Sequence, residues 1–519
     1  MAWLGWIIAA AAFLALGSAI PLWSYGRFAR RARGPESHAI GPGDTAALDR
    51  LLAPLEAAHP GQSGAAFVFD PLEAFRLRLR SATQASRSLD LLYYIWTDDL
   101  TGRLLAQALI EAADRGVRVR LLLDDVNVLG RDPTYLALDR HPEIEVRLFN
   151  PIRNRESPLR RGIELLFNLL RYNRRMHGKL WLVDGRLALA GGRNVGDVYF
   201  GAARGRRRNV DDLEMLLAGP VVGEAAQLFD SYWNSGLALP IRSLWHKRKS
   251  SLARFRERLR RDARSAAARA YLERAVPPGA PTALPIERLR WVERLELVAD
   301  PPQKALGSRR AGWLPASIMP VLQSAERDLR IMTPYFVPGT DGLASLIDLA
   351  RRGVRIEIVT NALAVADHTL VHGAYRWYRR ALIGAGVRLY EFAGRPAEQG
   401  PAGQGAAGQK TGRHVMLHGK AMIVDGTLGF AGSFNFDLRS AYLNTEMGVI
   451  FDDAALLAEL NARFDWATSP SQAYRLGLEG RLMAWLREGE APLNLEPHSP
   501  LMRRAASFVI GHLPIHRLL

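Results

Sequence analysis

The sequence predicts an α/β protein made of two tandem α/β/α domains, each with a mixed sheet, packed as a pseudo-dimer around one shared site. Three observations predict this fold class. At 519 residues the chain is longer than one hydrophobic core usually organises. A strand–helix–strand unit occurs twice in the same order. One polar motif also occurs twice, with a constant separation of 241 residues between its copies (418 − 177 = 241).

The first strand–helix–strand unit begins with LDLLYYIW at 89–96, an apolar run with the length and composition of a buried strand. Residues 101–114 have the apolar spacing of an amphipathic helix, and VRVRLLLDD at 117–125 is expected to form the next strand. A further strand is expected at 144–150. Such a βαβ unit predicts a mixed, mostly parallel sheet with helices on both faces.

The second unit repeats these elements later in the chain. We expect strands at 329–336, 354–360 and 387–392 and a helix at 341–351. The two helices end in the same tripeptide, Arg-Gly-Val, at 115–117 and 352–354. Glycine is the usual residue at a helix C-terminus, so it explains both ends. The repeat therefore predicts a tandem duplication.

The repeat also sets the expected domain boundaries. The segments are an N-terminal membrane anchor with a basic flank (1–34), a first domain (65–240), a basic linker or helix (241–300), a second domain (301–470) and an amphipathic C-terminal tail (471–519). Residues 246–274 are strongly basic and helix-forming, which fits a helix on an anionic membrane surface and, equally, a solvated linker helix. Residues 394–412 are rich in Gly, Ala and Gln, which predicts a mobile loop.

The N-terminus carries a long apolar segment. The first 26 residues have no charged side chain, and this length suffices for one helix to cross a bilayer. A cleaved signal peptide is the alternative, because residues 16–19 resemble a cleavage site, although a basic leading region is missing. Arginines follow directly at 27, 30, 31 and 33. The positive-inside tendency then predicts a single N-terminal span with a cytoplasmic body.

Composition narrows the class of protein and its partners. With 48% hydrophobic and 23% charged residues the chain lies in the ordinary globular range, which excludes collagen-like, disordered and polytopic membrane proteins. Lysine and arginine outnumber aspartate and glutamate by 69 to 52, and the net charge of +17 favours a polyanionic partner such as anionic lipid or nucleic acid. The absence of cysteine excludes disulfides, thiolate nucleophiles and cysteine-type zinc sites.

The duplicated polar motif supplies the candidate catalytic residues. MHGKLWLVDGRLALAGGRN contains His177, Lys179, Asp184, Gly192 and Asn194, and LHGKAMIVDGTLGFAGSFN contains His418, Lys420, Asp425, Ser433 and Asn435. In each copy histidine and lysine are two residues apart on an apolar strand, so both side chains emerge on one face. The Asp-Gly pair forms a hairpin turn, and the glycines let the backbone approach a ligand. A chance surface pair would explain one copy, but two copies in register predict a site.

This set of residues fits the transfer of a phosphodiester. The substrate is an anion, so catalysis needs fixed positive charge and hydrogen-bond donors at the non-bridging oxygens, which the lysines and asparagines can provide. One neutral imidazole can attack phosphorus to give a phosphohistidine, while a second, protonated imidazole donates to the leaving alcohol and later deprotonates the acceptor. Neither motif offers a carboxylate-rich cage, so we expect no metal and no cofactor.

Each histidine also needs a partner on its other ring nitrogen, which fixes the tautomer and stabilises the imidazolium. In the second half, Glu446 lies 28 residues after His418 (446 − 418 = 28). In the first half, NVDDLEMLLAGP offers three carboxylates. We choose Asp212, 35 residues after His177 (212 − 177 = 35), because an inserted GRRR run accounts for the longer interval.

Three further residues are weaker candidates. His372 and Tyr375, on a probable helix, are expected to line the substrate pocket together with Gly192. His368 and His372 are four residues apart, as in a zinc-binding helix, but no third ligand is apparent and Thr369 replaces the glutamate of a zinc-protease motif. The aromatic residues of LLYYIW are expected in the core or the pocket wall rather than as a stacking platform for bases.

Both motifs have the form HxKxxxxD followed by G-(G/S)-x-N, which resembles the phospholipase D superfamily over residues 65–470. DLLYYIWTDDLTGRLL, NRRMHGK, GGRNVGDVYFGA and GSFNFDLRS look most like the bacterial cardiolipin synthase C type. The resemblance implies phospholipase D-like domains with His177 as nucleophile and His418 as acid and base. It also implies a supporting role for Asp184 and Asp425, which the Asp-Gly turn would explain equally well. One departure is that Gly192 stands where the second copy has the hydroxyl of Ser433.

The resemblance implies a phosphatidyltransferase that makes cardiolipin by passing a phosphatidyl group to phosphatidylglycerol. In the C type the donor would be phosphatidylethanolamine, and the sequence identifies neither the donor nor a helper protein. The alternatives are a phospholipase D-type hydrolase, or less readily a nuclease, in which water resolves the phosphohistidine, and an inactive scaffold that binds anionic lipid. The expected partners are phospholipids and a membrane surface, and no nucleic acid is expected. With the bacterial resemblance, the N-terminal span implies a location in the bacterial inner membrane.

Overall fold

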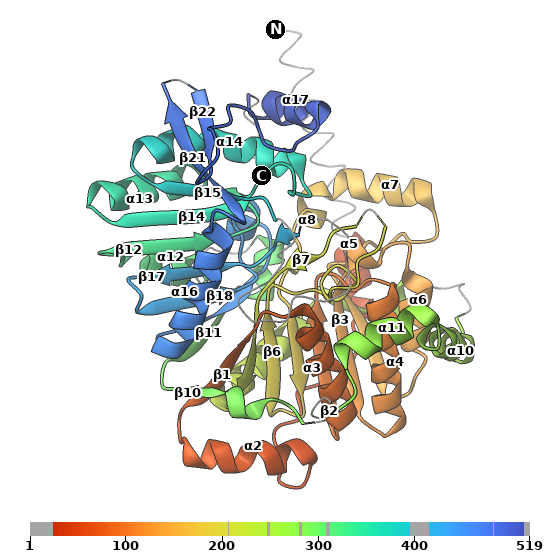
Figure 1. The fold of residues 1–519 in the computed structure, drawn as a ribbon. Helices are drawn as coiled ribbons and strands as arrows, with labels where there is room; N and C mark the ends of the chain where they lie inside the picture. The colour runs from red at the N-terminus through yellow and green to blue at the C-terminus, as the bar shows by residue number, and fades with distance from the viewer. Residues whose placement is uncertain are drawn as a thin grey trace, which may run out of the picture.

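The computed structural model of the chain describes residues 24–512 apart from 206, 246–249, 280–282, 308–311, 395–414 and 481. Two nine-stranded mixed sheets, one in each half of the chain, form the framework (Figure 1). The predicted α/β class with two tandem domains is therefore confirmed. All but residue 394 of the loop expected at 394–412 lies outside the described residues.

The first sheet has the strand order β10-β1-β8-β6-β5-β2-β3-β4-β9. Its strands are β1 (Ser63–Val68), β2 (Ser88–Tyr93), β3 (Arg118–Asp124), β4 (Ile144–Phe149), β5 (Leu180–Val183), β6 (Leu187–Gly191), β8 (Glu214–Ala218), β9 (Ala238–Pro240) and β10 (Arg290–Val292). Strands β2, β3 and β4 are parallel, as the expected βαβ unit requires, and β2 pairs antiparallel with β5.

Helices cover both faces of this sheet. They are α2 (Ala47–Ala58), α3 (Pro71–Gln84), α4 (Leu100–Asp114), α5 (Asp125–Val128), α6 (Asp132–Leu138), α7 (Pro158–Phe167), α8 (Leu169–Tyr172) and α9 (Pro220–Trp233). Apolar residues of α3 and α4 belong to a core on one face, and those of α9 belong to a core on the other. The second core continues into the other half of the chain, so α9 lies at the junction of the two halves.

The second sheet repeats this plan with the order β11-β20-β18-β17-β12-β14-β15-β21-β22. Its strands are β11 (Leu295–Ala299), β12 (Asp328–Met332), β14 (Arg355–Asn361), β15 (Arg388–Phe392), β17 (Ala421–Val424), β18 (Leu428–Gly432), β20 (Met447–Phe451), β21 (Ala473–Glu479) and β22 (Leu482–Leu486). Its helices are α12 (Leu314–Gln323), α13 (Gly339–Arg351), α14 (Thr369–Gly384), α15 (Leu438–Tyr442), α16 (Ala454–Thr468) and α17 (Leu501–Ile510). Strands β21 and β22 extend this sheet into the segment expected to be a C-terminal tail.

The two halves are joined by backbone pairing as well as by a shared core. Strand β7 (Val210–Asp211) of the first half pairs in parallel with β16 (Met416–Leu417) of the second. Met176 forms an equivalent parallel bridge with Thr445. A single apolar core contains Phe67 and Phe451, whose rings are in edge contact with centroids 5.7 Å apart. Because Met176 and β16 directly precede His177 and His418, these links bring the two histidine motifs together where the two halves meet.

The basic segment after the first domain packs on that domain. It forms α10 (Leu252–Ala263) and α11 (Ala266–Ala275), and Phe255 and Leu259 are buried in the first-domain core. Arg258 of α10 also pairs with Asp98 of the first domain at 2.7 Å. The segment is thus an amphipathic pair of helices with one face on the first domain.

The predicted inner-membrane span needs correction. Residues 1–23, which carry most of that prediction, lie outside the described residues. Within the described part of the chain, no helix combines the length and apolar character needed to cross a bilayer. The basic flank is helical at 24–32 and packs on the first domain, where the Tyr25 hydroxyl donates to the Pro151 carbonyl at 3.0 Å. A membrane-spanning location is therefore not supported.

Candidate active site

The two motif histidines lie just before the first strand of each motif hairpin, β5 and β17. Their backbones are fixed by the opposite half of the chain. The His177 amide donates to the Thr445 carbonyl at 2.8 Å, and the His418 amide donates to the Asp211 carbonyl at 2.6 Å. Both side chains line one cavity of about 920 Å³ between the two sheets. The duplication therefore builds a single site.

Each histidine is paired with a carboxylate of the other half. His177 Nδ1 lies 2.8 Å from Glu446 Oε2, and His418 Nδ1 lies 2.6 Å from Asp212 Oδ2. The structure thus brings together all four predicted residues, but crosses the pairing expected within each half. The cause is the inter-half backbone pairing, because Glu446 follows the bridge of Met176 with Thr445 and Asp212 follows β7. With Nδ1 engaged, Nε2 is the nitrogen left for substrate.

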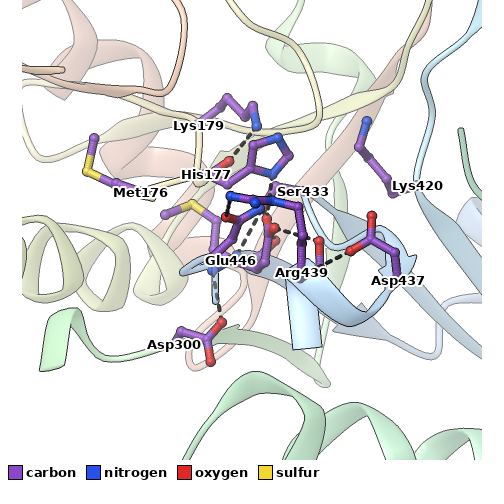
Figure 2. A network of polar contacts seen from close by, with 12 residues as sticks. Met176, His177, Lys179, Asp300, Lys420, Ser433, Asp437, Arg439 and Glu446 are labelled. Carbon is purple, nitrogen blue, oxygen red and sulfur yellow. Dashed lines mark hydrogen bonds and ion pairs between the residues drawn. The ribbon is translucent and has the colours of Figure 1, made fainter. Parts of the chain in front are cut away.

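Three groups hold the Glu446 side chain and backbone. Ser433 Oγ donates to Glu446 Oε2 at 2.6 Å, and Ser440 Oγ donates to Glu446 Oε1 at 2.8 Å. The Glu446 amide donates to Asp300 at 2.9 Å, and in Figure 2 Glu446 lies between Asp300 and His177. These bonds orient the carboxylate that orients His177.

In the first half, Gly192 stands at the position of Ser433, and there is no room for a side chain there. A Cβ atom on Gly192 would lie 2.3 Å from Asp212 Oδ1, so the shorter carboxylate approaches bare backbone where the second half has a serine. The Leu213 amide donates to the same Oδ1 at 2.9 Å. The absence of a side chain at Gly192 therefore leaves room for Asp212 to reach His418, and the Leu213 amide binds Asp212 where the Ser433 hydroxyl binds Glu446 in the second half.

The two motif lysines are buried beside the histidines. Lys420 Nζ donates to the His418 carbonyl at 2.5 Å, and Lys179 Nζ makes the equivalent bond to the His177 carbonyl (Figure 2). Burial lowers the pKa of Lys179 to about 7 and that of Lys420 to about 8, although Glu446 and Asp212 act in the opposite direction. A bound phosphate would restore the charge of both lysines, since a nearby anion favours the protonated form.

The histidines are likewise biased toward the neutral form. Burial and the neighbouring Lys179 hold the pKa of His177 well below its ordinary value. Burial and Lys420 lower the pKa of His418, although Asp212 raises it. Burial would raise the pKa of Asp212, but His418, Lys420 and Arg193 together lower it below its ordinary value. The two histidines and two lysines can therefore gain charge when an anionic phosphodiester binds, because a nearby anion favours their protonated forms.

The motif asparagines and two tyrosines complete the cavity near the histidines. Asn194 Nδ2 donates to the Tyr199 hydroxyl at 3.0 Å, and both residues line the cavity with Asn435. The ring of Tyr199 packs against His418 with centroids 5.5 Å apart, and that of Tyr94 packs against His177 at 4.9 Å. Tyr94 belongs to LLYYIW and was expected in the core or pocket wall. Tyr199 was not singled out, although it follows the first motif within NVGDVYFGA.

The motif aspartates lie at the far end of the hairpin strands and hold backbone. Asp184 accepts hydrogen bonds from the amides of residues 86, 87 and 88, and Asp425 accepts from those of 326, 327 and 328. Both adopt a left-handed φ of 53° at the turn. Neither lines the cavity. These bonds fit the explanation through the Asp-Gly turn and place both carboxylates away from the histidines.

His372 and Tyr375 also lie outside the cavity wall, contrary to expectation. Thr369, Leu370 and Val371 line the cavity, whereas His372 and Tyr375 are buried on the inner side of α14. His372 Nε2 lies 3.2 Å from Glu496 and 2.8 Å from Arg379. His372 thus links α14 to Glu496 of the C-terminal segment, and the ring of Tyr375 packs against His372 with centroids 5.6 Å apart.

A possible three-ligand metal group exists around the same histidine. Donor atoms of His372, Glu391 and Glu496 lie within 4.8 Å of one another among the described residues. The guanidinium of Arg379 already pairs with Glu391 at 2.6 Å and with Glu496 at 2.9 Å. Arginine supplies the positive charge in this cluster, so the donor set fits a buried salt bridge better than a cation site.

Comparison with known proteins agrees with this geometry. The family described as "Cardiolipin synthase, PLD-like domain" matches residues 79–233 and 318–468, one match in each half. Cardiolipin synthase C of Escherichia coli (strain K12) is 37% identical over 486 residues, covering 91% of this chain and 99% of that protein. An uncharacterised protein of Helicobacter pylori (strain J99) is 30% identical over 474 residues, covering 88% of this chain and 89% of the relative.

A solved structure shares the fold at low sequence identity. The phosphatidylserine synthase of Haemophilus influenzae Rd KW20 superposes with a TM-score of 0.54 at 14% identity, covering 82% of this chain and 91% of that one. The duplicated fold and the paired motifs define a member of the phospholipase D superfamily. Within it, the chain belongs to the cardiolipin synthase type, a class of phosphatidyltransferases.

Proposed function

We propose that this enzyme transfers a phosphatidyl group from a phospholipid donor to phosphatidylglycerol, forming cardiolipin through a phosphohistidine on His177. The observation that carries the proposal is the crossed arrangement at the cavity. Two imidazoles from different halves face one space, and each is held at Nδ1 by a buried carboxylate. Such a pair can divide nucleophilic attack and proton transfer between two side chains.

In the first step, His177 Nε2 attacks phosphorus and the bond from phosphorus to the leaving alcohol breaks. His418, as the imidazolium, donates a proton to the leaving oxygen. Burial and Lys420 lower the pKa of His418, but the incoming phosphodiester anion and Asp212 favour its charged form. The lowered pKa of His177 keeps its imidazole neutral and nucleophilic.

In the second step, neutral His418 takes the proton from a hydroxyl of the acceptor. The acceptor oxygen attacks phosphorus, and the bond from phosphorus to His177 breaks. Lys179 and Lys420 neutralise the charge that develops on the non-bridging oxygens in both steps. Transfer rather than hydrolysis requires that the acceptor be held in line, because positioning can supply effective concentrations far above that of water.

The test is to incubate purified protein with labelled phosphatidylethanolamine in vesicles, with and without phosphatidylglycerol, and to quantify the products. We expect cardiolipin as the main product when phosphatidylglycerol is present and phosphatidic acid as the minor one. The His418→Asn variant controls for contaminating activity. Phosphatidic acid dominating at saturating phosphatidylglycerol would assign a phospholipase D, and cleavage of DNA without lipid turnover would assign a nuclease.

A further inference from the structure

Four arginines line the active-site cavity in addition to the motif residues: Arg207, Arg208, Arg439 and Arg503. Two of them already have polar side-chain partners. Arg439 donates to Asn173 Oδ1 at 2.6 Å, and exposed Arg207 lies 3.9 Å from Asp99. The other two, Arg208 and Arg503, contact no carboxylate at ion-pair distance within the described part of the chain. Like Arg439, whose hydrogen bonds go to the neutral Asn173 and Asn444, these two cations line the cavity without a paired carboxylate among the described residues.

Both guanidinium groups donate to neutral acceptors in one short segment, residues 364–369, which leads into α14. Arg208 Nη1 donates to the Ala364 carbonyl at 2.6 Å. Arg503 donates to the Ala366 carbonyl through Nη2 and to Thr369 Oγ1 through Nε at 3.0 Å. Such bonds fix the direction of a guanidinium without neutralising it, and each group keeps further N–H donors.

The two charges also act on each other. Burial and Arg208 hold the pKa of Arg503 below its ordinary value, although Asp367 acts in the opposite direction. Burial lowers the pKa of Arg208. Two half-buried arginines that repel each other are stabilised by an anion between them, and bidentate donation to phosphate oxygens is a favoured arginine interaction.

We propose that Arg208 and Arg503 form a second phosphodiester-binding subsite, which holds the phosphate of the acceptor phospholipid while the donor phosphate occupies the two histidines. The inference rests on the proposed function, because cardiolipin contains two phosphodiesters joined by one glycerol. The subsite is composite: Arg208 belongs to the inserted run of the first domain and Arg503 to α17 near the C-terminus. It gives the enzyme a means to prefer a lipid acceptor over water.

The experiment compares two acceptors with the same labelled donor lipid. Phosphatidylglycerol carries a phosphate, whereas free glycerol offers the same hydroxyl chemistry without one. In the Arg208→Gln/Arg503→Gln double variant we expect the KM for phosphatidylglycerol to rise about tenfold or more, the effect of losing charge-assisted hydrogen bonds. Transfer to glycerol should change by less than about twofold, since no phosphate is bound there.

Arg207→Gln is the matched control, because this exposed arginine belongs to the same run and lines the same cavity. It should leave the KM for phosphatidylglycerol within about twofold of the unmodified value. Loss of the Arg503 bonds could disturb α17, and a lowered melting temperature of the double variant would reveal this. The single Arg208→Gln variant leaves α17 intact and should still raise the KM for phosphatidylglycerol. Inorganic phosphate, added as a competitor against phosphatidylglycerol, should inhibit the unmodified protein more strongly than the double variant.

Equal losses with both acceptors would overturn the subsite, because they would place the arginines at the reacting phosphate. An unchanged KM for phosphatidylglycerol in the double variant would overturn it as well. These results differ from failure of the proposed function, in which the unmodified protein itself makes no cardiolipin and the subsite falls with it.

Discussion

His177 Nδ1 lies 2.8 Å from Glu446 Oε2, a residue 269 positions later in the other half of the chain. His418 and Asp212 make the reciprocal contact, 206 positions apart. Each half therefore lacks the carboxylate that orients its own histidine. The site exists only where the two domains meet, and the shared apolar core that joins them is part of what positions the chemistry.

The crossed pairs predict different consequences for the two carboxylates. Asp212→Asn should impair His418 as acid, and Glu446→Gln should impair His177 as nucleophile, each lowering kcat by about 100-fold or more on natural donor lipids. A donor with a nitrophenol leaving group needs no protonation. With this donor, Asp212→Asn should release nitrophenol at a rate near that of the unmodified enzyme, whereas Glu446→Gln should remain slow. The amplitude and rate of nitrophenol release in a single turnover measure the difference. The reverse pattern would contradict the assignment of roles.

The pH dependence of kcat/KM should report the buried lysines. Lys179 and Lys420, with pKa values of about 7 and about 8, lose their charge as the pH rises through these values. Because kcat/KM reports the free enzyme, loss of the lysine charges should add a fall above about pH 7 to 8 to the one that begins at the lowered pKa of His418, the proposed acid. The acid limb should lie well below pH 6.5, since the pKa of His177 is lowered from that value and its neutral form is the nucleophile.

The same lysines predict a shift between the two profiles. A bound phosphodiester raises their pKa values, so kcat should hold its value to higher pH than kcat/KM. This shift is tested by measuring kcat and kcat/KM as a function of pH in buffers of constant ionic strength. Identical alkaline limbs in both profiles would show that the lysines do not contact the bound anion.

Gly192→Ala should damage the site through Asp212. The added Cβ would lie 2.3 Å from Asp212 Oδ1, and moving this carboxylate separates it from His418. We expect kcat to fall about tenfold or more and the free energy of unfolding to drop by about 1–3 kcal/mol, as for overpacking. Gly223→Ala in α9 is the control, because its Cβ would meet no atom within 4 Å and alanine favours the helix. Full activity in Gly192→Ala would contradict the required close approach.

Asp300→Asn should weaken the junction behind Glu446. Asp300 Oδ2 accepts from Lys304 Nζ at 2.8 Å and from the Glu446 amide at 2.9 Å, and both side chains of the ion pair are fully buried. Removing the charge leaves buried Lys304 uncompensated, which costs about 3–5 kcal/mol in the free energy of unfolding. Asp348→Asn, in a pair with exposed Arg352, should cost less than about 1 kcal/mol. Chemical denaturation of the three proteins provides the comparison.

Much of this fold could be predicted from the chain because the duplication repeats local patterns. The expected strands at 117–125 and 354–360 correspond to β3 and β14, and the expected helices at 101–114 and 341–351 to α4 and α13. These elements follow from apolar periodicity and helix-ending glycines. The motif histidines and lysines were predictable for the same reason, since two copies in register identify them.

The pairing of carboxylates with histidines could not be predicted in this way. Intervals along the chain suggested partners within each half, whereas the register between β7 and β16 exchanges them. That register is a long-range contact with no local sequence signal. His372 failed for a related reason, because its partner Glu496 lies in the segment expected to be a tail. The role of Asp184 could not be decided from the sequence, because aspartate is common both in tight turns and in catalytic sites.

The most direct test of the two-histidine account is to trap the covalent intermediate. A labelled phosphatidyl donor with a nitrophenol leaving group should react with the His418→Asn variant, since departure needs no acid, and the adduct should persist because the acceptor hydroxyl is not deprotonated. Alkaline denaturation followed by peptide mass spectrometry should locate the label on His177, and His177→Asn should carry none. Label on His418 in the His177→Asn variant, or no label in either protein while the unmodified enzyme turns over, would contradict a phosphohistidine at His177.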